Sequence, residues 1–260
     1  MPILDDLVRA LHSGEVDVVD LTSNLDAGTP LLPLPPQWPN TPAFQLHEIS
    51  HYDERGPAWY WNWFLTGEHT GTHFDAPIHW VSGKDLPNNS VDKIPARFFI
   101  GPACVLDATP ESGRDPDFLV DIAFIENWER QHGRIAPRSW VLLRTGWSRR
   151  AVPEAYLNVR DDGPHTPGWA REASLLLAKD RNVLGVGVET IGTDAGQAAK
   201  FDPPFCNHFT MHGYGKFGLT SLINLDRLPP KGAVVIAAPL KIVGGSGSPV
   251  RAIAIVPRQT

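Results

Sequence analysis

The stretch GEHTGTHFDAPIHW, residues 67–80, places three histidines and one aspartate within eleven residues, all at odd-numbered positions. Gly71 and Pro77 are poor residues for a helix interior, and the threonines add β-branched side chains. We therefore predict that this stretch is extended. Alternate side chains of a strand share a face, so one face carries the four polar residues, which are His69, His73, Asp75 and His79.

The extended stretch must bend if these four side chains are to meet. Ten residue steps span roughly 33 Å when fully extended, whereas neighbouring odd positions lie only about 7 Å apart. His73 and Asp75 can therefore approach one another directly. The ends must fold in, and we place the bends at Gly71, which tolerates special dihedrals, and at Pro77, which cannot continue a strand ladder.

The residue types indicate metal chemistry. Two imidazoles and a carboxylate form a mixed nitrogen and oxygen site that suits one Zn²⁺ or Mn²⁺ ion with room for water. Structural zinc sites are closed and rich in cysteine, and this stretch has none, which favours catalysis. Such an ion acidifies water and polarises a carbonyl. His79 is placed beyond Pro77 to act as general base toward the water and general acid toward a leaving group.

Composition narrows the class of protein. The 260 residues carry a formal net charge of −6 and show no run of lysines and arginines, which disfavours a nucleic-acid partner. We see no secretory or membrane-spanning segment, so we expect a cytoplasmic protein with no membrane partner. Cys104 and Cys206 have no metal-type CxxC neighbour, and we expect two buried, reduced thiols.

The region before the histidines begins with a short amphipathic helix expected over residues 3–12 and closed by Gly14. A strand follows at residues 16–21. The proline-rich residues 29–42 are expected to form a rigid loop at the rim of a pocket. A PxxP ligand for a partner domain is the alternative.

Aromatic residues dominate the segment just upstream of the histidines. Residues 57–67 alternate as a strand, with Trp59, Trp61 and Trp63 on one face. We expect these tryptophans in a core or an interface, or lining an aromatic pocket together with Trp80.

The rest of the chain is rich in apolar strands. Helical spacing occurs at 117–131 and at 167–181, where Thr166 is the expected N-cap and Pro167 the first helical residue. Residues 244–251, GGSGSPVR, lack the ending of a phosphate-binding loop and are expected to form a tight turn between strands. The predicted strands lie in 97–107, 139–147, 182–190, 233–243 and 250–257. Because no linker or repeat interrupts them, we predict one α/β domain over residues 1–260.

The sequence HTGTHFDAPIH, residues 69–79, resembles the His-x-Gly-Thr-His-x-Asp-x-Pro-x-His signature of the putative cyclase family, which includes bacterial kynurenine formamidase and isatin hydrolase. All seven fixed positions of that pattern are met. Weaker resemblances continue along the chain in DLTSNLDAGTP from Asp20, VLLRTGW from Val141, VGVETIGTDAG from Val186, LINLDRLP from Leu222 and GSGSPVRAIAI near the end.

The resemblance implies a fold, an assembly and an activity. The fold would be a compact α/β domain with a β-barrel-like core of mixed strands flanked by a few helices. The assembly would be a homodimer or homotetramer, and the activity metal-dependent hydrolysis of a small amide or ester. By the same match, His69, His73 and Asp75 would bind the metal and His79 would be catalytic.

The chain departs from the family pattern in its last third. Family members carry a further histidine followed twelve residues later by Glu, or by Gln in isatin-hydrolase-like members. Aligned through LINLDRLP, His208 takes the histidine position and Thr220 the other. A threonine hydroxyl is a weak neutral ligand, which favours one metal ion. His208 is then an additional ligand or substrate contact, with His212 as its rival, and the alternative for either is an ordinary core histidine.

We therefore predict a hydrolase that cleaves the C–N bond of a small, cyclic or aromatic amide with a metal-activated water and His79 as proton carrier. A lactone hydrolase acting on a C–O bond with the same residues is the first alternative. A non-catalytic metal-binding or ligand-binding protein is the second, although such a protein does not require His79.

Overall fold

The computed structural model describes residues 2–34, 37–150 and 152–258. Within them, nine strands form one mixed sheet in the order β1-β15-β13-β5-β7-β11-β12-β4-β14. The four central strands are parallel, and they are β5 (Ile100–Asp107), β7 (Trp140–Arg144), β11 (Gly185–Val188) and β12 (Phe217–Thr220). The antiparallel flanks are β1 (Val16–Asp20), β15 (Ile253–Pro257) and β13 (Lys231–Ile236) on one side, and β4 (His73–Asp75) and β14 (Gly247–Pro249) on the other.

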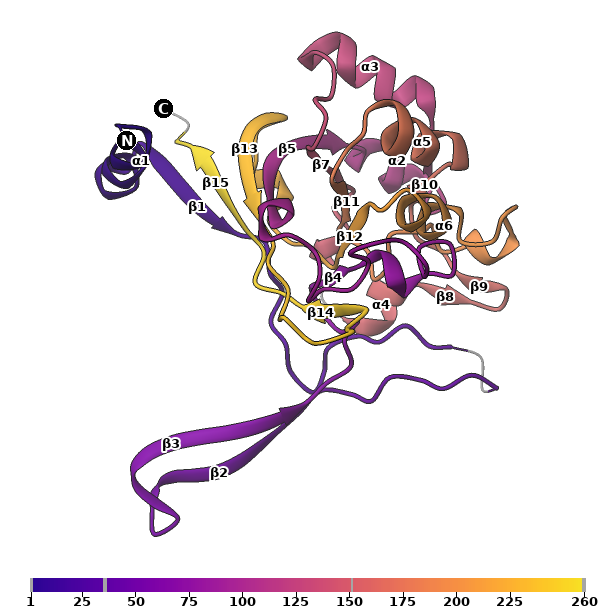
Figure 1. The fold of residues 1–260 in the computed structure, drawn as a ribbon. Coiled ribbons are helices and arrows are strands. Elements are labelled where there is room, and N and C mark those ends of the chain that lie inside the picture. The colour runs from indigo at the N-terminus through magenta and orange to yellow at the C-terminus, as the bar shows by residue number, and fades with distance from the viewer. Residues whose placement is uncertain (1, 35–36, 151, 259–260) are drawn as a thin grey trace.

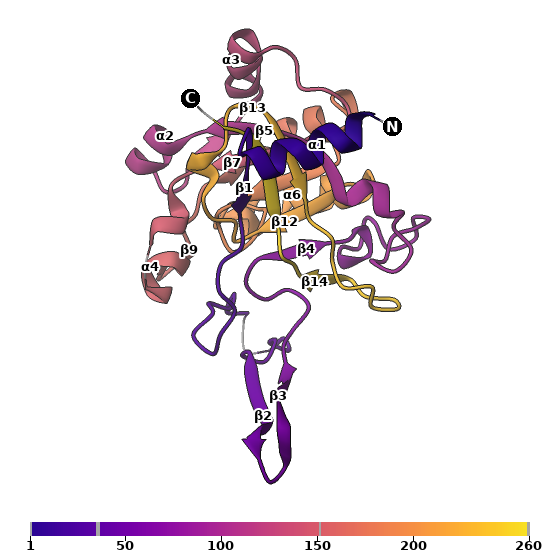
Figure 2. The same ribbon diagram turned by 90° about the vertical axis from the view of Figure 1, so that its left-hand side faces the viewer.

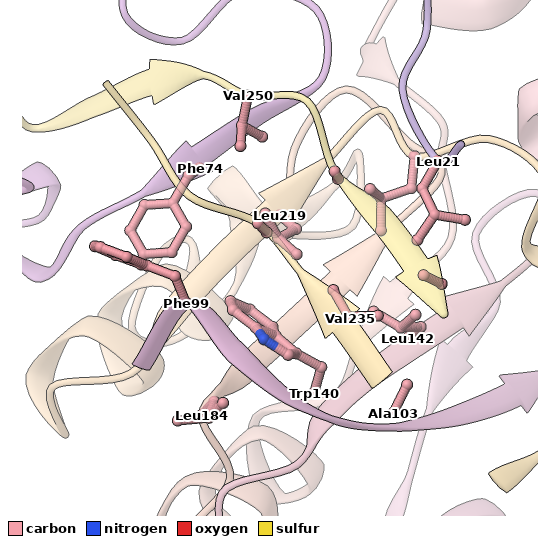
Figure 3. Close-up of a cluster of buried hydrophobic side chains, with 14 of the residues drawn as sticks. Leu21, Phe74, Phe99, Ala103, Trp140, Leu142, Leu184, Leu219, Val235 and Val250 are labelled. Carbon is pink, nitrogen blue, oxygen red and sulfur yellow. The ribbon is translucent and has the colours of Figure 1, made fainter. Parts of the chain in front are cut away.

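The sheet is curled, and its two faces pack against different partners. Along β7, Trp140 and Leu142 belong to a core made of strand side chains and of residues from the loops and turns beside them, as Figure 3 shows. Val141 and Leu143 point to the opposite face and join a second core with the helices. This alternation has the period of two that a strand imposes. The predicted α/β fold with a β-barrel-like core is therefore confirmed, whereas its extent over residues 1–260 stays a prediction.

The helices are few and short, and three of them cover the outer face of the central strands. The second core includes Ile125 of α3, Ala173 of α5 and Met211 of α6, beside residues of β5, β7 and β11. The helices are α1 (Pro2–Ser13), α2 (Thr109–Arg114), α3 (Ile122–His132), α4 (Pro153–Leu157), α5 (Arg171–Leu175), the π-helical η4 (Leu176–Asp180) and α6 (Cys206–Gly213). The 3₁₀ turns are η1 (Pro77–His79), η2 (Ala96–Phe99), η3 (Trp147–Arg149), η5 (Ala198–Lys200) and η6 (Leu225–Arg227).

A long hairpin projects from the body of the molecule. It consists of β2 (Gln45–Asp53) and β3 (Gly56–Leu65), and both views show it pointing away from the sheet (Figure 1, Figure 2). We call it the arm. The strand predicted for residues 57–67 is confirmed over residues 57–65, but Trp59, Trp61 and Trp63 are about half exposed, at 49%, 54% and 52%. Placing them in the core of this chain was therefore wrong.

Two predicted helices begin later than expected. Residues 119–120 form strand β6 (Leu119–Val120), and α3 begins only after Asp121, whose side chain accepts a hydrogen bond from the Phe124 amide at 2.8 Å. Residues 168–169 form β10 (Gly168–Trp169), which pairs with β6, so neither Thr166 nor Pro167 starts a helix. These two-residue pairings are long-range contacts that local spacing does not reveal.

The remaining local predictions hold in most parts. The N-terminal helix is present, and Gly14 follows it with a positive φ of 75°. Residues 29–34 and 37–42 contain no helix or strand, as expected of a proline-rich loop, while the prolines at 35 and 36 lie outside the described residues. Cys104 and Cys206 are buried and free. Residues 244–251 begin with a turn but also contain β14. The other short strands are β8 (Val159–Arg160) and β9 (Gly163–Pro164).

No helix among the described residues combines the length and the apolarity needed to cross a lipid bilayer.

Candidate metal centre

The histidine-rich stretch is extended only in its middle. His73 and Asp75 belong to the three-residue strand β4, whereas residues 69–72 form bends and residues 77–79 form the turn η1. Gly71 has a positive φ of 61°, and Pro77 is the first residue of η1. Both bends were predicted, and an extended conformation over the whole of residues 69–79 was wrong.

Strand β4 lies between β12 and β14, and glycines make room for its side chains. Gly218 of β12 and Gly247 of β14 both pair with Asp75. A Cβ atom on Gly218 would lie 2.6 Å from Asp75 Oδ2, and one on Gly247 would lie 2.5 Å from His69 Cε1. Any larger residue at either position would collide with the candidate ligands.

His69 joins the segment before β4 to the loop before β14. Its Nδ1 lies 2.8 Å from Asp75 Oδ1, and its Nε2 lies 2.8 Å from the Ser246 hydroxyl. That hydroxyl donates its proton to the Glu68 carboxylate, so it accepts one from His69 Nε2. His69 Nδ1 then either donates a proton to the Asp75 carboxylate or turns a lone pair toward it. Two facing lone pairs require a proton or a metal cation between them.

His73 is oriented by the backbone and by Thr220. Its Nδ1 donates to the Gly71 carbonyl at 2.8 Å, which leaves Nε2 facing Asp75 Oδ1 at 3.3 Å. The Thr220 hydroxyl lies 2.9 Å from Nδ1 and 3.2 Å from Nε2 of the same ring. Thr220 is directly opposite His73 in the sheet. Thr220 therefore contacts the candidate metal ligand His73 directly.

Helix α6 contributes two further imidazoles. His208 Nδ1 contacts the Asp194 carboxylate at 2.5 Å, and its Nε2 lies 3.9 Å from Asp75 Oδ2. His212 Nδ1 donates to the Lys216 carbonyl at 3.0 Å, leaving its buried Nε2 without a hydrogen-bond partner among the described residues. In both rings the Nδ1 proton is directed away, which frees Nε2 to face the centre.

His79 lies closer to the other residues than the sequence suggested. Its ring stacks on His69 with centroids 3.8 Å apart and meets His208 and His212 at 5.6 and 5.9 Å. The premise that Pro77 carries His79 beyond reach of an ion was therefore wrong. The turn η1 folds the chain back instead.

The group as a whole fits a metal ion. We call His69, His73, Asp75, His79, His208 and His212 the histidine cluster. Ligand atoms of His69, Asp75 and His79 lie within 4.8 Å of one another, as do those of Asp75, His208 and His212. Asp75 is shared by both sets, is 1% exposed, and its Oδ2 has no partner among the described residues. A buried carboxylate oxygen without a protein partner is suited to bind a cation.

Burial and neighbouring charges shift the pKa values within the cluster. Burial tends to raise the pKa of Asp75, but the charges and hydrogen bonds of His73 and His69 outweigh it and hold the pKa well below its usual range. Burial lowers the pKa of His79 well below its usual range and lowers that of His212 to about 4. Burial also opposes protonation of His208, yet the Asp194 carboxylate raises its pKa. Within the cluster, His79 and His212 therefore favour the neutral form, whereas His208 favours the protonated form.

One tryptophan of the sequence prediction lies at the cluster. The Trp80 ring is 4.9 Å from the ring of His208 and 5.6 Å from that of Phe205, so it forms a wall beside the centre. Trp59, Trp61 and Trp63 are instead on the arm.

Sequence reasoning missed three residues that hold the histidines in place. Asp194 orients His208, and the Glu68–Ser246 pair orients His69. Asp194 lies in VGVETIGTDAG and Ser246 in GGSGSPVR. The sequence did contain one sign of these residues: each motif has a polar residue among glycines, and glycines allow a backbone to approach another group closely.

The comparisons with known proteins agree with this geometry. The family model described as "Putative cyclase" matches residues 19–195. Isatin hydrolase from Roseibium aggregatum is 50% identical over 258 residues, covering 98% of this chain and 97% of that protein. Kynurenine formamidase from Sphingopyxis alaskensis is 32% identical over 232 residues, covering 88% of this chain and 95% of that protein.

Solved structures agree as well. Isatin hydrolase A from Labrenzia aggregata, bound to benzyl benzoate, superposes with a TM-score of 0.97 at 52% identity, covering 98% of this chain and 99% of the other. An isatin hydrolase bound to the product analogue thioisatinate gives 0.97 at 48% identity, covering 99% and 98%. These relatives confirm the prediction of a metal-dependent hydrolase of a small amide. The chain belongs to the putative cyclase family.

Proposed function

We propose that the substrate is isatin or a closely related cyclic aryl amide. The observation that carries the proposal is the buried Asp75 carboxylate, whose free Oδ2 faces His208 within a cluster of five imidazoles. The substrate class is supported by two relatives named isatin hydrolase, which match the chain over nearly its whole length. Trp80 adds a flat aromatic wall beside the cluster, against which a fused ring can stack.

We assign the metal-binding role to His69, His73 and Asp75, with one Mn²⁺ or Zn²⁺ ion per chain. A bound ion of this kind supplies a lowered pKa for water and an electrophile for the carbonyl oxygen. His69 Nδ1 and His73 Nε2 both face Asp75 Oδ1, at 2.8 and 3.3 Å. Thr220 supports the count of one ion because it provides a neutral hydroxyl, which hydrogen-bonds to His73.

We assign proton transfer to His79. Its pKa is lowered by burial, so the ring is a neutral base at physiological pH and can accept a proton from water. As the water oxygen bonds to the carbonyl carbon and the C–N bond breaks, this proton passes to the departing aryl nitrogen. The product is one ring-opened molecule that carries a carboxylate and an arylamine, and the second proton of the water is released to solvent. The stacking of His79 on His69 fixes its orientation.

His208 and His212 are assigned to the carbonyl side of the site. Asp194 fixes His208 and favours its protonated form, so the ring can donate a hydrogen bond to a substrate oxygen. His212 has a free Nε2 and serves as the rival contact. The His69 side chain is 24% exposed, more than those of His73 and His208 at 7% and 12%, which indicates the side from which substrate enters.

The assembly is proposed to be a homodimer or homotetramer built through the arm. Exposed apolar surface of this extent indicates an interaction site. Tyr60 and Phe64 are 46% and 55% exposed on the face opposite the three tryptophans, so both faces of the arm need a partner. A second copy of the chain is the occupant we propose. The free, buried thiols support a cytoplasmic location.

The test is hydrolysis of isatin by the purified protein after chelation and readdition of Mn²⁺ or Zn²⁺. Isatin, a formanilide and an aryl lactone are compared at equal concentration, and product is followed by absorbance. Isatin should be cleaved with the highest kcat/KM, and chelation should abolish the reaction. Preference for the lactone would overturn the assignment to a C–N bond, and turnover indifferent to chelation would overturn the metal.

A further inference from the structure

A second cavity, of about 360 Å³, lies behind the turn that carries His79. It is lined by Pro77, where η1 begins, and by Phe217 of β12. None of the described residues lining it is a histidine or a carboxylate. Its chemistry is therefore separate from that of the histidine cluster. We call it the lysine cavity, after Lys216.

Two cationic residues line the lysine cavity, and one residue contacts both. Lys216 Nζ donates to the side-chain oxygen of Asn182 at 2.5 Å. The backbone amide of Arg138 donates to the Asn182 carbonyl at 2.9 Å. Asn182 thereby holds the Lys216 ammonium group and the backbone of Arg138 along one wall. With no carboxylate in the lining, the potential inside the cavity is positive.

These charges have no acidic partner among residues 2–34, 37–150 and 152–258. Neither Lys216 nor Arg138 has a carboxylate oxygen within 4.0 Å. Lys216 is half-buried, and burial lowers the pKa of its ammonium group. Arg138 is exposed, so only Lys216 carries a cost of partial burial, and an anion beside its ammonium group would offset that cost.

The backbone around the cavity is also unusual. Asn88, Arg138 and Asn182 all line it with positive φ values of 54°, 62° and 49°. Non-glycine residues rarely adopt this conformation, and arginine has no local side-chain hydrogen bond that favours it. Such strain persists where the surrounding structure fixes it, often at a ligand site.

One wall of the lysine cavity is aromatic. The guanidinium of Arg138 lies 4.9 Å from the ring centroid of Phe98, and that of Arg97 lies at the same distance. Ile94 and Leu184 add apolar surface. A cavity of this size holds one small ring compound, and its polar groups lie on one side only.

We propose that the lysine cavity binds a small aromatic carboxylate. Its carboxylate would contact Lys216 and Arg138, and its ring would lie against Ile94 and Leu184, because guanidinium groups already lie over the ring of Phe98. The positive lining selects the charge, and the aromatic and apolar walls select a flat organic acid over an inorganic anion. The proposal does not depend on the substrate of the histidine cluster.

The test is a titration of the metal-loaded protein with 2-aminobenzoate, in which binding is measured by isothermal titration calorimetry. The same titration is repeated on His73→Ala. Binding in the lysine cavity should survive His73→Ala. Lys216→Gln or Arg138→Gln removes a charge-assisted hydrogen bond and should weaken it about tenfold or more. Lys241→Gln makes the same change in net charge outside the cavity lining and should leave binding unchanged. Loss of all binding on His73→Ala, or no loss in either cavity variant, would overturn the proposal.

Two further measurements distinguish a role of the Lys216 charge from a structural role, and binding of organic anions from binding of inorganic ones. Thermal unfolding establishes that each variant folds, and Lys216→Arg, which keeps the charge, should retain binding within about threefold. If Lys216→Arg binds as weakly as Lys216→Gln, the role of Lys216 is structural and the proposal fails. If inorganic phosphate displaces 2-aminobenzoate at equal concentration, the aromatic specificity is wrong.

Discussion

Gly218 offers a direct way to disturb the metal centre without touching a ligand. A Cβ atom there would lie 2.6 Å from Asp75 Oδ2 and 3.2 Å from Asp75 Cβ. The backbone cannot retreat, because Gly218 pairs with Val186 on one side and with Asp75 on the other. Gly218→Ala must therefore displace the carboxylate. Overpacking of this kind costs about 1–3 kcal/mol.

The expected result is a joint loss of stability, metal and turnover. For a domain of this size, each kcal/mol lowers the Tm by about 2–4 °C. Metal content is measured by atomic absorption after dialysis, and turnover with isatin. Gly113→Ala is the matched control, because a Cβ there meets nothing within 4 Å and Gly113 lies in helix α2, where alanine is favoured. Wild-type metal content and turnover in Gly218→Ala would refute the placement of Asp75 at the centre.

Three further outcomes are expected. The purified protein should hold about one divalent ion per chain, removable by chelator with loss of activity, and two fully occupied metals would contradict the role given to Thr220. Thr220→Glu should raise the metal stoichiometry more than it raises turnover; an increase in turnover without added metal would contradict this. Asp117 and then Asp162 raise the pKa of His165, so these ion pairs stabilise the fold fully below the unfolded pKa of about 6.5 and are lost as pH rises through the raised value. His165→Gln should therefore lower the Tm more at pH 5.5 than at pH 8.5, whereas an equal loss at both would show that the pairs do not contribute.

The alternation of polar and apolar residues around Phe74 made much of the site predictable. It places His73 and Asp75 on one face and Phe74 in the core, where it is fully buried. The bends at Gly71 and Pro77 followed from backbone chemistry alone. Their effect on His79 did not, because the direction of a bend depends on the packing of η1 against α6.

The parts that could not be predicted depend on long-range pairing. The short strands β6 and β10 exist because residues 119–120 and 168–169 pair across about fifty positions of sequence. Local helical spacing in both segments gave no sign of this. The contacts of His208 with Asp194 and of His69 with Ser246 likewise join separate segments of the chain. The exposure of Trp59 on the arm could not be predicted from the sequence, because an alternating pattern predicts a strand but not which residues pack against it.

The central claim is that His79 moves protons beside an ion held by His73 and Asp75. Metal content and turnover of His79→Ala, measured beside His73→Ala, test it most directly. His79→Ala should keep its metal while turnover falls about 10²–10⁴-fold, the usual contribution of general acid–base catalysis. His73→Ala should lose metal and turnover together. Loss of metal from His79→Ala to the same extent would contradict the account and make His79 a ligand, as its 3.8 Å stacking on His69 permits.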